Sequence, residues 1–498
     1  MEIDVVETPP AEVDADVLAF AVSDPVELPP AGQELDRLVD GELRHLIDEG
    51  ELKGGRGKAT FVHTGGRISA HRVGTAGLGA PADQDADSLR TAAASIAVRT
   101  GEVGGRSVAW VLGENGLTPR EQARAIVEGT ALGPYDAGRW KTRGNDRRRA
   151  VERLVLCGPG AAAVAREANR ANVVSTWTNG CRDYVNAPPN ECTPARLAEW
   201  AEETAGRFES LRFEAWGPDE IRAAGMGALA AVSQGSNNEP RLIKLTHEPA
   251  GAKGDVFLGL VGKAITFDAG GLSLKPADRM EEMKADMGGG AAVLAAMGAI
   301  AELGLPIRVL AVVPSCENMP GGHAYRPGDI ITALNGKTIE VTNTDAEGRL
   351  ILADALWHTR ESGATHLLDL ATLTGAMVMA MGDYYAGLFS NDPEWAASIR
   401  DAAEASGDHA WIWPLHETYR RYIASSFADM KNSSEYRQGS PILAARFLEE
   451  FVGDGPWAHL DIAGTAYLER GRDDYYDCGG ATGYGVRLLA ELAGRLSS

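Results

Sequence analysis

The chain has 498 residues, enough for two domains that each bury a core. Its 70 acidic side chains against 48 basic ones give a formal net charge of −22, which argues against general binding to nucleic-acid phosphates or to anionic membranes. No apolar run is long enough to cross a bilayer, and the acidic amino terminus lacks the basic and apolar regions of a secretory signal, so we expect a cytoplasmic globular protein.

The first third of the chain alternates strand-like and helix-like segments. Residues 16–23 predict a buried strand, residues 34–50 a single amphipathic helix, and residues 153–158 another strand. Thr118, followed by a proline, is a typical N-cap and predicts a helix directly after it. This alternation predicts a small N-terminal α/β domain over residues 1–165.

A long helix over residues 160–185 is predicted next, because the prolines in residues 186–194 forbid its continuation. We take this helix as the connector between domains and assign residues 166–498 to the second domain. Four short, continuous apolar runs in that domain indicate strands covered on both faces: residues 241–247, 255–262, 307–314 and 366–372. The predicted fold class is therefore α/β, with a larger C-terminal catalytic domain whose mostly parallel central sheet is flanked by helices. Trp411 and Trp413 are expected in its core.

Chemistry-bearing residues gather in three stretches where strands are predicted to end, which is where open α/β sheets bind ligands. The first stretch carries Lys263, Asp268 and Lys275, the second Asp286, and the third Asp345, Glu347 and Arg349. Each stretch alone also fits a structural role, as a solvated turn or as a carboxylate near a helix N-terminus.

Together, the four carboxylates and a lysine form an oxygen-rich set that suits a pair of divalent cations. Such a pair acidifies a shared water, and nearby positive groups stabilise a developing oxyanion. None of the ten histidines stands in an H-E-x-x-H motif, so a metal site here would be built mainly from oxygen ligands. From the residues alone, the prediction is a dinuclear hydrolase, with solvated or helix-capping carboxylates as the alternative.

The order and wording of these stretches resemble the leucine aminopeptidase family of dinuclear metallopeptidases. The octapeptide NTDAEGRL at residues 343–350 is that family's signature. The match extends from about Arg182 to near the carboxyl end, whereas the first 165 residues match only in general character. Ala264 and Ala269 stand where the family usually has glycine and serine.

The resemblance implies a set of metal ligands, namely Lys263, Asp268, Asp286, Asp345 and Glu347. Asp268 and Glu347 would bridge the two ions. Asp345 would belong to one ion, and Lys263 and Asp286 to the other, more exchangeable one. Lys275 and Arg349 would be catalytic residues that do not bind a metal ion. The substrate pocket would include Met283, Thr372 and Gly375.

The function implied by this resemblance is an aminopeptidase that hydrolyses the amino-terminal residue, leucine and other apolar residues preferred, through a metal-bridged water. The implied cofactors are two divalent ions per subunit, Mn²⁺ or Zn²⁺, with a bicarbonate at Arg349 as general base. The implied partners are peptides with a free amino terminus and further copies of the chain in a homohexamer. The alternative is a non-catalytic binding or regulatory homologue with the same fold. A catalytically dead paralogue is less favoured still, because every implied ligand position is intact.

Overall fold

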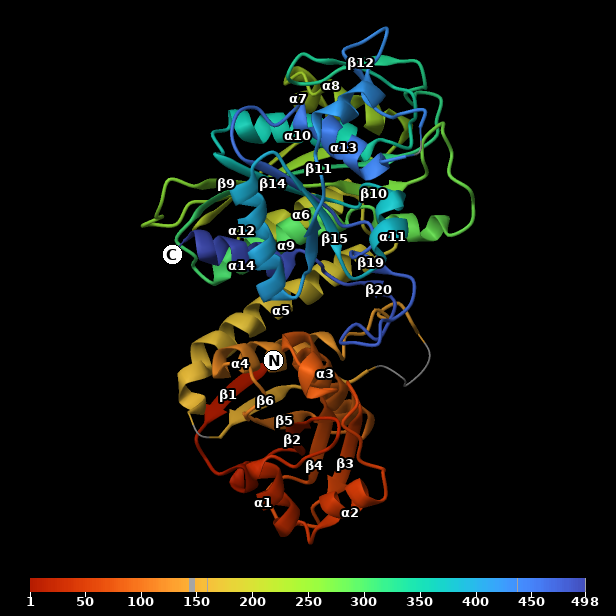
Figure 1. Cartoon of the computed structure of the whole chain (residues 1–498). Helices are drawn as coiled ribbons and strands as arrows, with labels where there is room; N and C mark the ends of the chain where they lie inside the picture. Colours follow the sequence, from red (N-terminus) through yellow and green to blue (C-terminus); the bar gives the residue numbers. More distant parts are fainter. Residues whose placement is uncertain (143–147, 159, 437, 498) are drawn as a thin grey trace. The chain divides into compact units, whose positions relative to one another are not determined.

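The computed structural model describes residues 1–142, 148–158, 160–436 and 438–497. The chain forms two units, residues 1–179 with 469–479 and residues 180–468 with 480–498 (Figure 1). The two units divide inside helix α5 (Ala165–Asn186), between residues 179 and 180, and the domain boundary near residue 165 stays a prediction. None of the helices in the described ranges combines the length and apolarity needed to cross a membrane.

The first unit contains a six-stranded sheet with helices α3 (Ala86–Glu102) and α4 (Pro119–Leu132) packed on each other. In spatial order the strands are β1 (Glu2–Val6), β6 (Arg153–Cys157), β5 (Ser107–Val111), β2 (Val17–Val22), β4 (Arg72–Gly77) and β3 (Ala59–His63). All neighbours run parallel except β3 and β4. The Thr118 hydroxyl accepts the backbone N–H of Glu121 at 3.3 Å, so the predicted N-cap and the small α/β domain are confirmed.

The single helix predicted over residues 34–50 is wrong. Two helices occupy this region, α1 (Pro30–Leu38) and α2 (Glu42–Asp48). Asp40 and Gly41 between them have φ angles of 59° and 79°, in the left-handed region, which ends an α-helix. The apolar residues keep a helical spacing across the break, but the backbone at Asp40 and Gly41 is not helical.

The second unit is built on a nine-stranded mixed sheet. In spatial order the strands are β16 (Ala410–Ile412), β15 (Ala386–Ser390), β18 (Trp457–Asp461), β14 (His366–Ala371), β9 (Phe257–Gly262), β11 (Arg308–Asn318), β8 (Arg241–His247) and β7 (Leu211–Trp216), with β10 (Ala264–Asp268) paired to β11. The central strands β18, β14, β9 and β11 are parallel, and the antiparallel pairs lie toward the edges. The mostly parallel sheet is confirmed.

Helices cover both faces of this sheet (Figure 1). One layer contains α9 (Gly288–Glu302), α12 (Pro393–Ser406) and α14 (Val486–Leu496), and the other contains α10 (Gly348–Glu361) and α13 (Ser440–Glu449). Every residue of β9 is buried, as expected for a strand between two helical layers. Trp413 packs partly against this core, but Trp411 lies on the edge strand β16 and is 62% exposed, so its predicted place in the core is wrong.

Candidate metal centre

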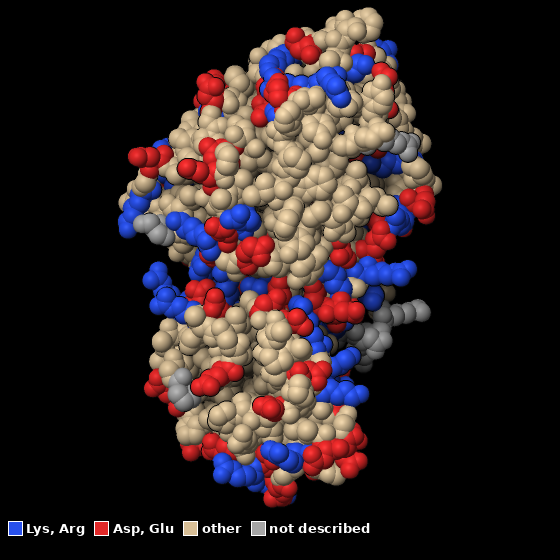
Figure 2. Space-filling view, in the orientation of Figure 1, with Lys and Arg blue, Asp and Glu red and all other residues tan. Residues whose placement is uncertain are grey.

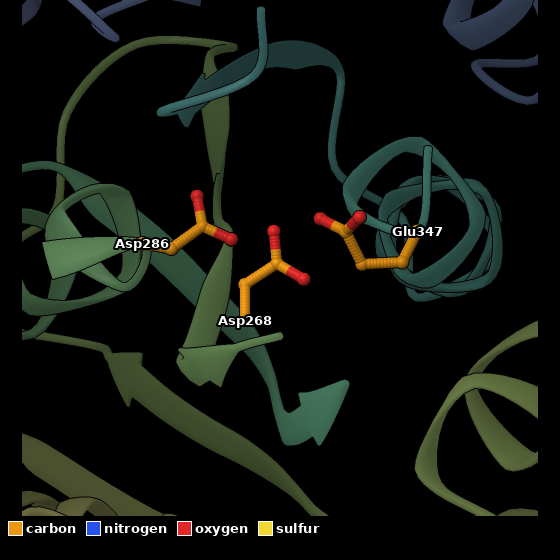
Figure 3. Close-up of side chains that lie close together, drawn as sticks. All are labelled: Asp268, Asp286 and Glu347. Carbon is orange, nitrogen blue, oxygen red and sulfur yellow. The ribbon is translucent and has the colours of Figure 1, made fainter. Parts of the chain in front are cut away.

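The predicted ligands come from the carboxyl ends of neighbouring strands and from the start of a helix. Lys263 directly follows β9, and Asp268 is the last residue of β10. Asp286 directly follows the 3-10 helix η5 (Met280–Ala285), and Glu347 directly precedes α10. Carboxylate oxygens of Asp268, Asp286 and Glu347 lie within 4.8 Å of one another, and the three groups face a common space (Figure 3).

Lys263 joins two of these carboxylates from a buried position. Its Nζ lies 2.8 Å from Asp286 Oδ1 and 2.9 Å from Glu347 Oε1, and donates to the carbonyl oxygen of Thr372 at 3.0 Å. The lysine passes so close to the start of α10 that a Cβ atom at Gly348 would lie 2.7 Å from Nζ. A larger residue at that position would therefore displace the lysine from where it contacts the cluster.

Lys275 joins the other two predicted carboxylates. Its Nζ lies 2.8 Å from Asp268 Oδ2 and 2.6 Å from Asp345 Oδ1. The side chains of Lys275 and Asp345 are 22% and 31% exposed, against 3% for Lys263. Lys275 and Asp345 therefore form the side of the cluster that is open to solvent, from which a substrate can approach.

The protonation of the cluster reflects burial and mutual repulsion. Burial, with the negative charge of Glu347 acting in the same direction, raises the pKa of Asp268 to about 6. Burial also raises the pKa of Asp286 and of Asp345 above the usual range. For Glu347, the positive charges of the two lysines outweigh burial, so its pKa lies below the usual range. The raised pKa values thus reflect carboxylates that repel one another in a buried site, a repulsion that a bound cation would relieve.

This donor set fits divalent metal binding. Among the described residues, Asp286 Oδ2 has no hydrogen-bond partner although it is buried, and such an oxygen is costly unless a cation or water satisfies it. Carboxylate oxygens with one amine nitrogen suit ions such as Mn²⁺ and Zn²⁺. The carboxylates alone hold Lys263 as an ammonium and raise its pKa, whereas a dication beside it favours the neutral amine that can act as a ligand.

Arg349 is the second residue of α10 and is buried, with 6% exposure. Its Nη1 donates to the carbonyl oxygen of Asn432 at 2.9 Å, while Nε has no partner within the described ranges. Burial lowers the pKa of the guanidinium to about 10. A buried guanidinium with a free donor can hold a small planar anion.

Of the three predicted pocket residues, Thr372 contacts the cluster. Thr372 follows β14, and its hydroxyl donates to Asp286 Oδ1 at 2.7 Å, so the structure brings it into direct contact with a predicted ligand. Met283 lies on η5, half-buried. Gly375 starts helix α11 (Gly375–Met381), and a methyl group there would meet open space.

The structure also shows a polar residue that the sequence analysis missed. Asn318 is fully buried at the end of β11, and its Nδ2 donates to Asp268 Oδ1 at 2.8 Å. The strand predicted over residues 307–314 ends before Asn318, whereas β11 continues to Asn318 and pairs it with Asp268 across parallel strands. Asn318 orients a predicted bridging carboxylate.

A doubly covered, mostly parallel sheet with a buried carboxylate–lysine cluster at its carboxyl edge defines a metal-dependent hydrolase. The cytosol aminopeptidase family matches the chain in two parts, its N-terminal domain at residues 17–144 and its catalytic domain at residues 179–490. The chain belongs to the cytosol aminopeptidase family and is a metal-dependent aminopeptidase.

Curated relatives match over nearly the whole chain. A protein of Roseiflexus castenholzii named "Probable cytosol aminopeptidase" is 45% identical, over 90% of this chain and 92% of its own length. A protein of the same name from Aeromonas salmonicida is 38% identical, over 99% of this chain and 97% of its own length.

Solved structures of similar proteins share the complete fold. A mutant of tomato leucine aminopeptidase has a TM-score of 0.89 and 32% identity, covering 99% of this chain and 96% of that one. The bottromycin maturation enzyme BotP in complex with Mn has a TM-score of 0.84 and 35% identity, covering 97% of this chain and 100% of that one.

Proposed function

We propose that the chain removes single amino-terminal residues, with a preference for leucine and other apolar residues, from peptides with a free amino terminus. The observation that carries this proposal is the cluster of buried carboxylates joined by Lys263 and Lys275. The ligands would be Lys263, Asp268, Asp286, Asp345 and Glu347. When bound, two Mn²⁺ or Zn²⁺ ions would polarise the scissile carbonyl and acidify a shared water.

Lys275 would act on the substrate directly. Its Nζ lies on the more exposed side of the cluster and is held by Asp268 and Asp345, which raise the pKa of the amine more than burial lowers it. It therefore stays an ammonium at neutral pH. An ammonium fixed beside the scissile carbonyl stabilises the negative charge that develops on its oxygen.

Arg349 would hold a bicarbonate that serves as general base. The support is its buried guanidinium, whose Nε has no partner in the described part of the chain. No histidine belongs to the cluster of described metal-ligating side chains, so a proton acceptor has to come from elsewhere. Exposure at Gly375 and the half-buried Met283 leave room for an apolar first side chain, although apolar pockets discriminate only modestly.

The test is leucine release from leucine anilide and from its N-acetylated form, after chelation and after addition of Mn²⁺ or Zn²⁺. We expect turnover of the free-amine substrate alone, lost on chelation and restored by metal. Equal turnover of the acetylated substrate would contradict the requirement for a free amine. Absence of turnover with either metal would contradict the leucine preference and favour a binding role.

We further propose a cytoplasmic homohexamer. The larger unit exposes several large apolar side chains, which are typical of subunit contacts: Leu274 at 60%, Met379 at 88%, Trp411 at 62% and Phe427 at 79%. On the face seen in Figure 2, a broad uncharged area lies over this unit, and elsewhere basic side chains are interspersed with acidic ones. With the net charge of −22, this distribution favours protein partners over nucleic acid or membrane.

A further inference from the structure

The loop after β14, residues 372–374, is fastened by a carboxylate outside the predicted ligand set. Asp461, the last residue of β18, is fully buried. Its Oδ1 accepts the backbone N–H groups of Leu373 at 3.2 Å and Thr374 at 3.4 Å, and its Oδ2 accepts the Thr374 hydroxyl at 2.5 Å. The N–H of Ala463 also donates to Oδ1, at 3.2 Å. One carboxylate thus fixes the loops that follow two adjacent strands.

The residue that this arrangement places is Thr372. Its carbonyl oxygen accepts from Lys263 Nζ at 3.0 Å, and its hydroxyl donates to Asp286 Oδ1 at 2.7 Å. Thr372 therefore contacts the two ligands that we assign to one and the same ion. The register supports the connection, because Ala371 pairs with Asp461 across β14 and β18.

We propose that Asp461 and Thr374 are positioning residues for one of the two metal sites. They hold Thr372 where it aims Lys263 and Asp286 at the same ion. The inference rests on the proposed function, since it uses the assignment of these two ligands to the more exchangeable ion.

The physical reason is that the side chains of Lys263 and Asp286 could each adopt several orientations if nothing restrained them. A neutral lysine amine has one lone pair, at the end of four flexible methylene groups. Donation of an N–H to the Thr372 carbonyl restricts the directions in which that lone pair can point. Donation from the Thr372 hydroxyl to Asp286 Oδ1 likewise leaves Oδ2, which lacks a partner among the described residues, as the free oxygen. A shift of the loop would release both ligands together.

A purely structural role is the alternative. Thr374 directly precedes the short helix α11, so Asp461 could serve only to secure the start of that helix. In that case, removal of the Thr374 hydroxyl would lower stability and leave the affinity for metal unchanged. The two roles therefore differ in a measurable way.

The test is Mn²⁺ binding to the chelator-stripped full chain by isothermal titration calorimetry. For Thr374→Val, which removes only the hydroxyl bond, we expect one of the two Mn²⁺ sites to weaken by about tenfold or more while the other stays within about threefold. Thr374→Ser keeps the hydroxyl and should bind both ions as the wild type does. The matched control is Thr359→Val, which removes a buried hydroxyl bond to the Ala355 carbonyl inside α10 and should change stability only.

Two wild-type-like sites in Thr374→Val would overturn the inference, as would equal weakening of both sites. A wild-type chain that binds fewer than two Mn²⁺ ions would overturn the proposed function and this inference with it. Hydrogen exchange of the unaltered chain is an independent measurement that does not depend on how a variant folds. The amides of Leu373 and Thr374 should be protected in the chelator-stripped protein, and rapid exchange there would show that Asp461 does not fix the loop.

Discussion

At Gly348 the start of α10 passes close to the predicted ligand Lys263. A Cβ atom there would lie 2.7 Å from Lys263 Nζ and 2.8 Å from Lys263 Cδ, closer than side chains pack. We predict that Gly348→Ala displaces the lysine from Asp286 and Glu347 and lowers both Mn²⁺ affinity and leucine anilide turnover by about tenfold or more. Calorimetry and initial rates measure the two effects.

The matched control for this change is Gly180→Ala. Gly180 also lies within a helix, α5, and a Cβ atom added there would meet nothing within 4 Å. This variant should keep metal affinity and turnover, and alanine should slightly stabilise the helix. If Gly348→Ala behaved like this control, the close approach would not limit the site.

Single residues differ in how far the sequence predicts them. Lys263 and Asp268 stand in a distinctive stretch after an apolar run, so their place at strand ends could be inferred before the fold was known. Asp286 instead follows a 3-10 helix. Asn318 and Asp461 could not be identified in that way. Their roles depend on which strands are neighbours, because Asn318 pairs with Asp268 across two strands and Asp461 reaches the loop after β14. Strand order is a tertiary property that apolar periodicity does not contain.

Helix α10, which starts beside the cluster, carries a half-buried histidine near its other end. The ring of His358 lies 4.9 Å from the ring of Trp216, edge on. Burial, assisted by the positive charge of Lys244, lowers the pKa of His358 to about 4. Because the unfolded chain binds the proton more tightly than the folded one, the stability contributed by the neutral ring is complete above about pH 6.5 and is lost as the pH falls toward about 4.

At the scale of a single helix, the prediction concerns the free energy of unfolding at acidic pH. Between about pH 7.5 and about pH 5, the wild type should lose about 1–2 kcal/mol more unfolding free energy than His358→Gln, whose side chain does not titrate. Urea unfolding with chelator present at both pH values measures the difference, and the carboxylates common to both proteins cancel. An equal loss in the two proteins would mean that the ring is solvated in the folded state.

Elements were predictable where local and tertiary preferences agree. The central strands and helices α4 and α5 lie where apolar runs, a capping threonine and the following prolines place them, because burial reinforces the local signal. The region of α1 and α2 is different. Its apolar spacing suited one helix, while the left-handed backbone at Asp40 and Gly41 divides it. A glycine within an amphipathic pattern does not by itself reveal whether the backbone turns there.

At the scale of the whole molecule, a segment near the carboxyl end belongs to the unit formed by residues 1–179. Residues 469–479 belong to the first unit, where Asp477 forms an ion pair with Arg148 and Cys478 Sγ donates to the Tyr135 carbonyl at 3.8 Å. Shifts in composition along a chain predict only domains that are continuous in the sequence. They do not predict that residues 469–479 belong to the first unit. The predicted domains, residues 1–165 and 166–498, remain a prediction based on a continuous division.

The oligomeric state depends on the exposed surface of the whole folded chain. Trp411 lies on the edge strand β16, and Phe427 is 79% exposed, so both offer apolar area that a subunit contact would remove from water. Each aromatic side chain can bury about 150–250 Å², a substantial part of the roughly 800 Å² that each partner contributes to a stable interface. Sedimentation velocity of the wild type should give the mass of six 52.7 kDa chains.

The double variant Trp411→Glu, Phe427→Glu should then sediment as a smaller species, because burying two carboxylates without partners costs several kcal/mol. Leu38→Glu, on α1 of the other unit, introduces one such carboxylate at a side chain that is only 37% exposed and serves as the control, with an unchanged mass expected. A wild type that sediments as one chain would contradict the hexamer. An assembled double variant would instead place the subunit contacts on other surfaces of the chain.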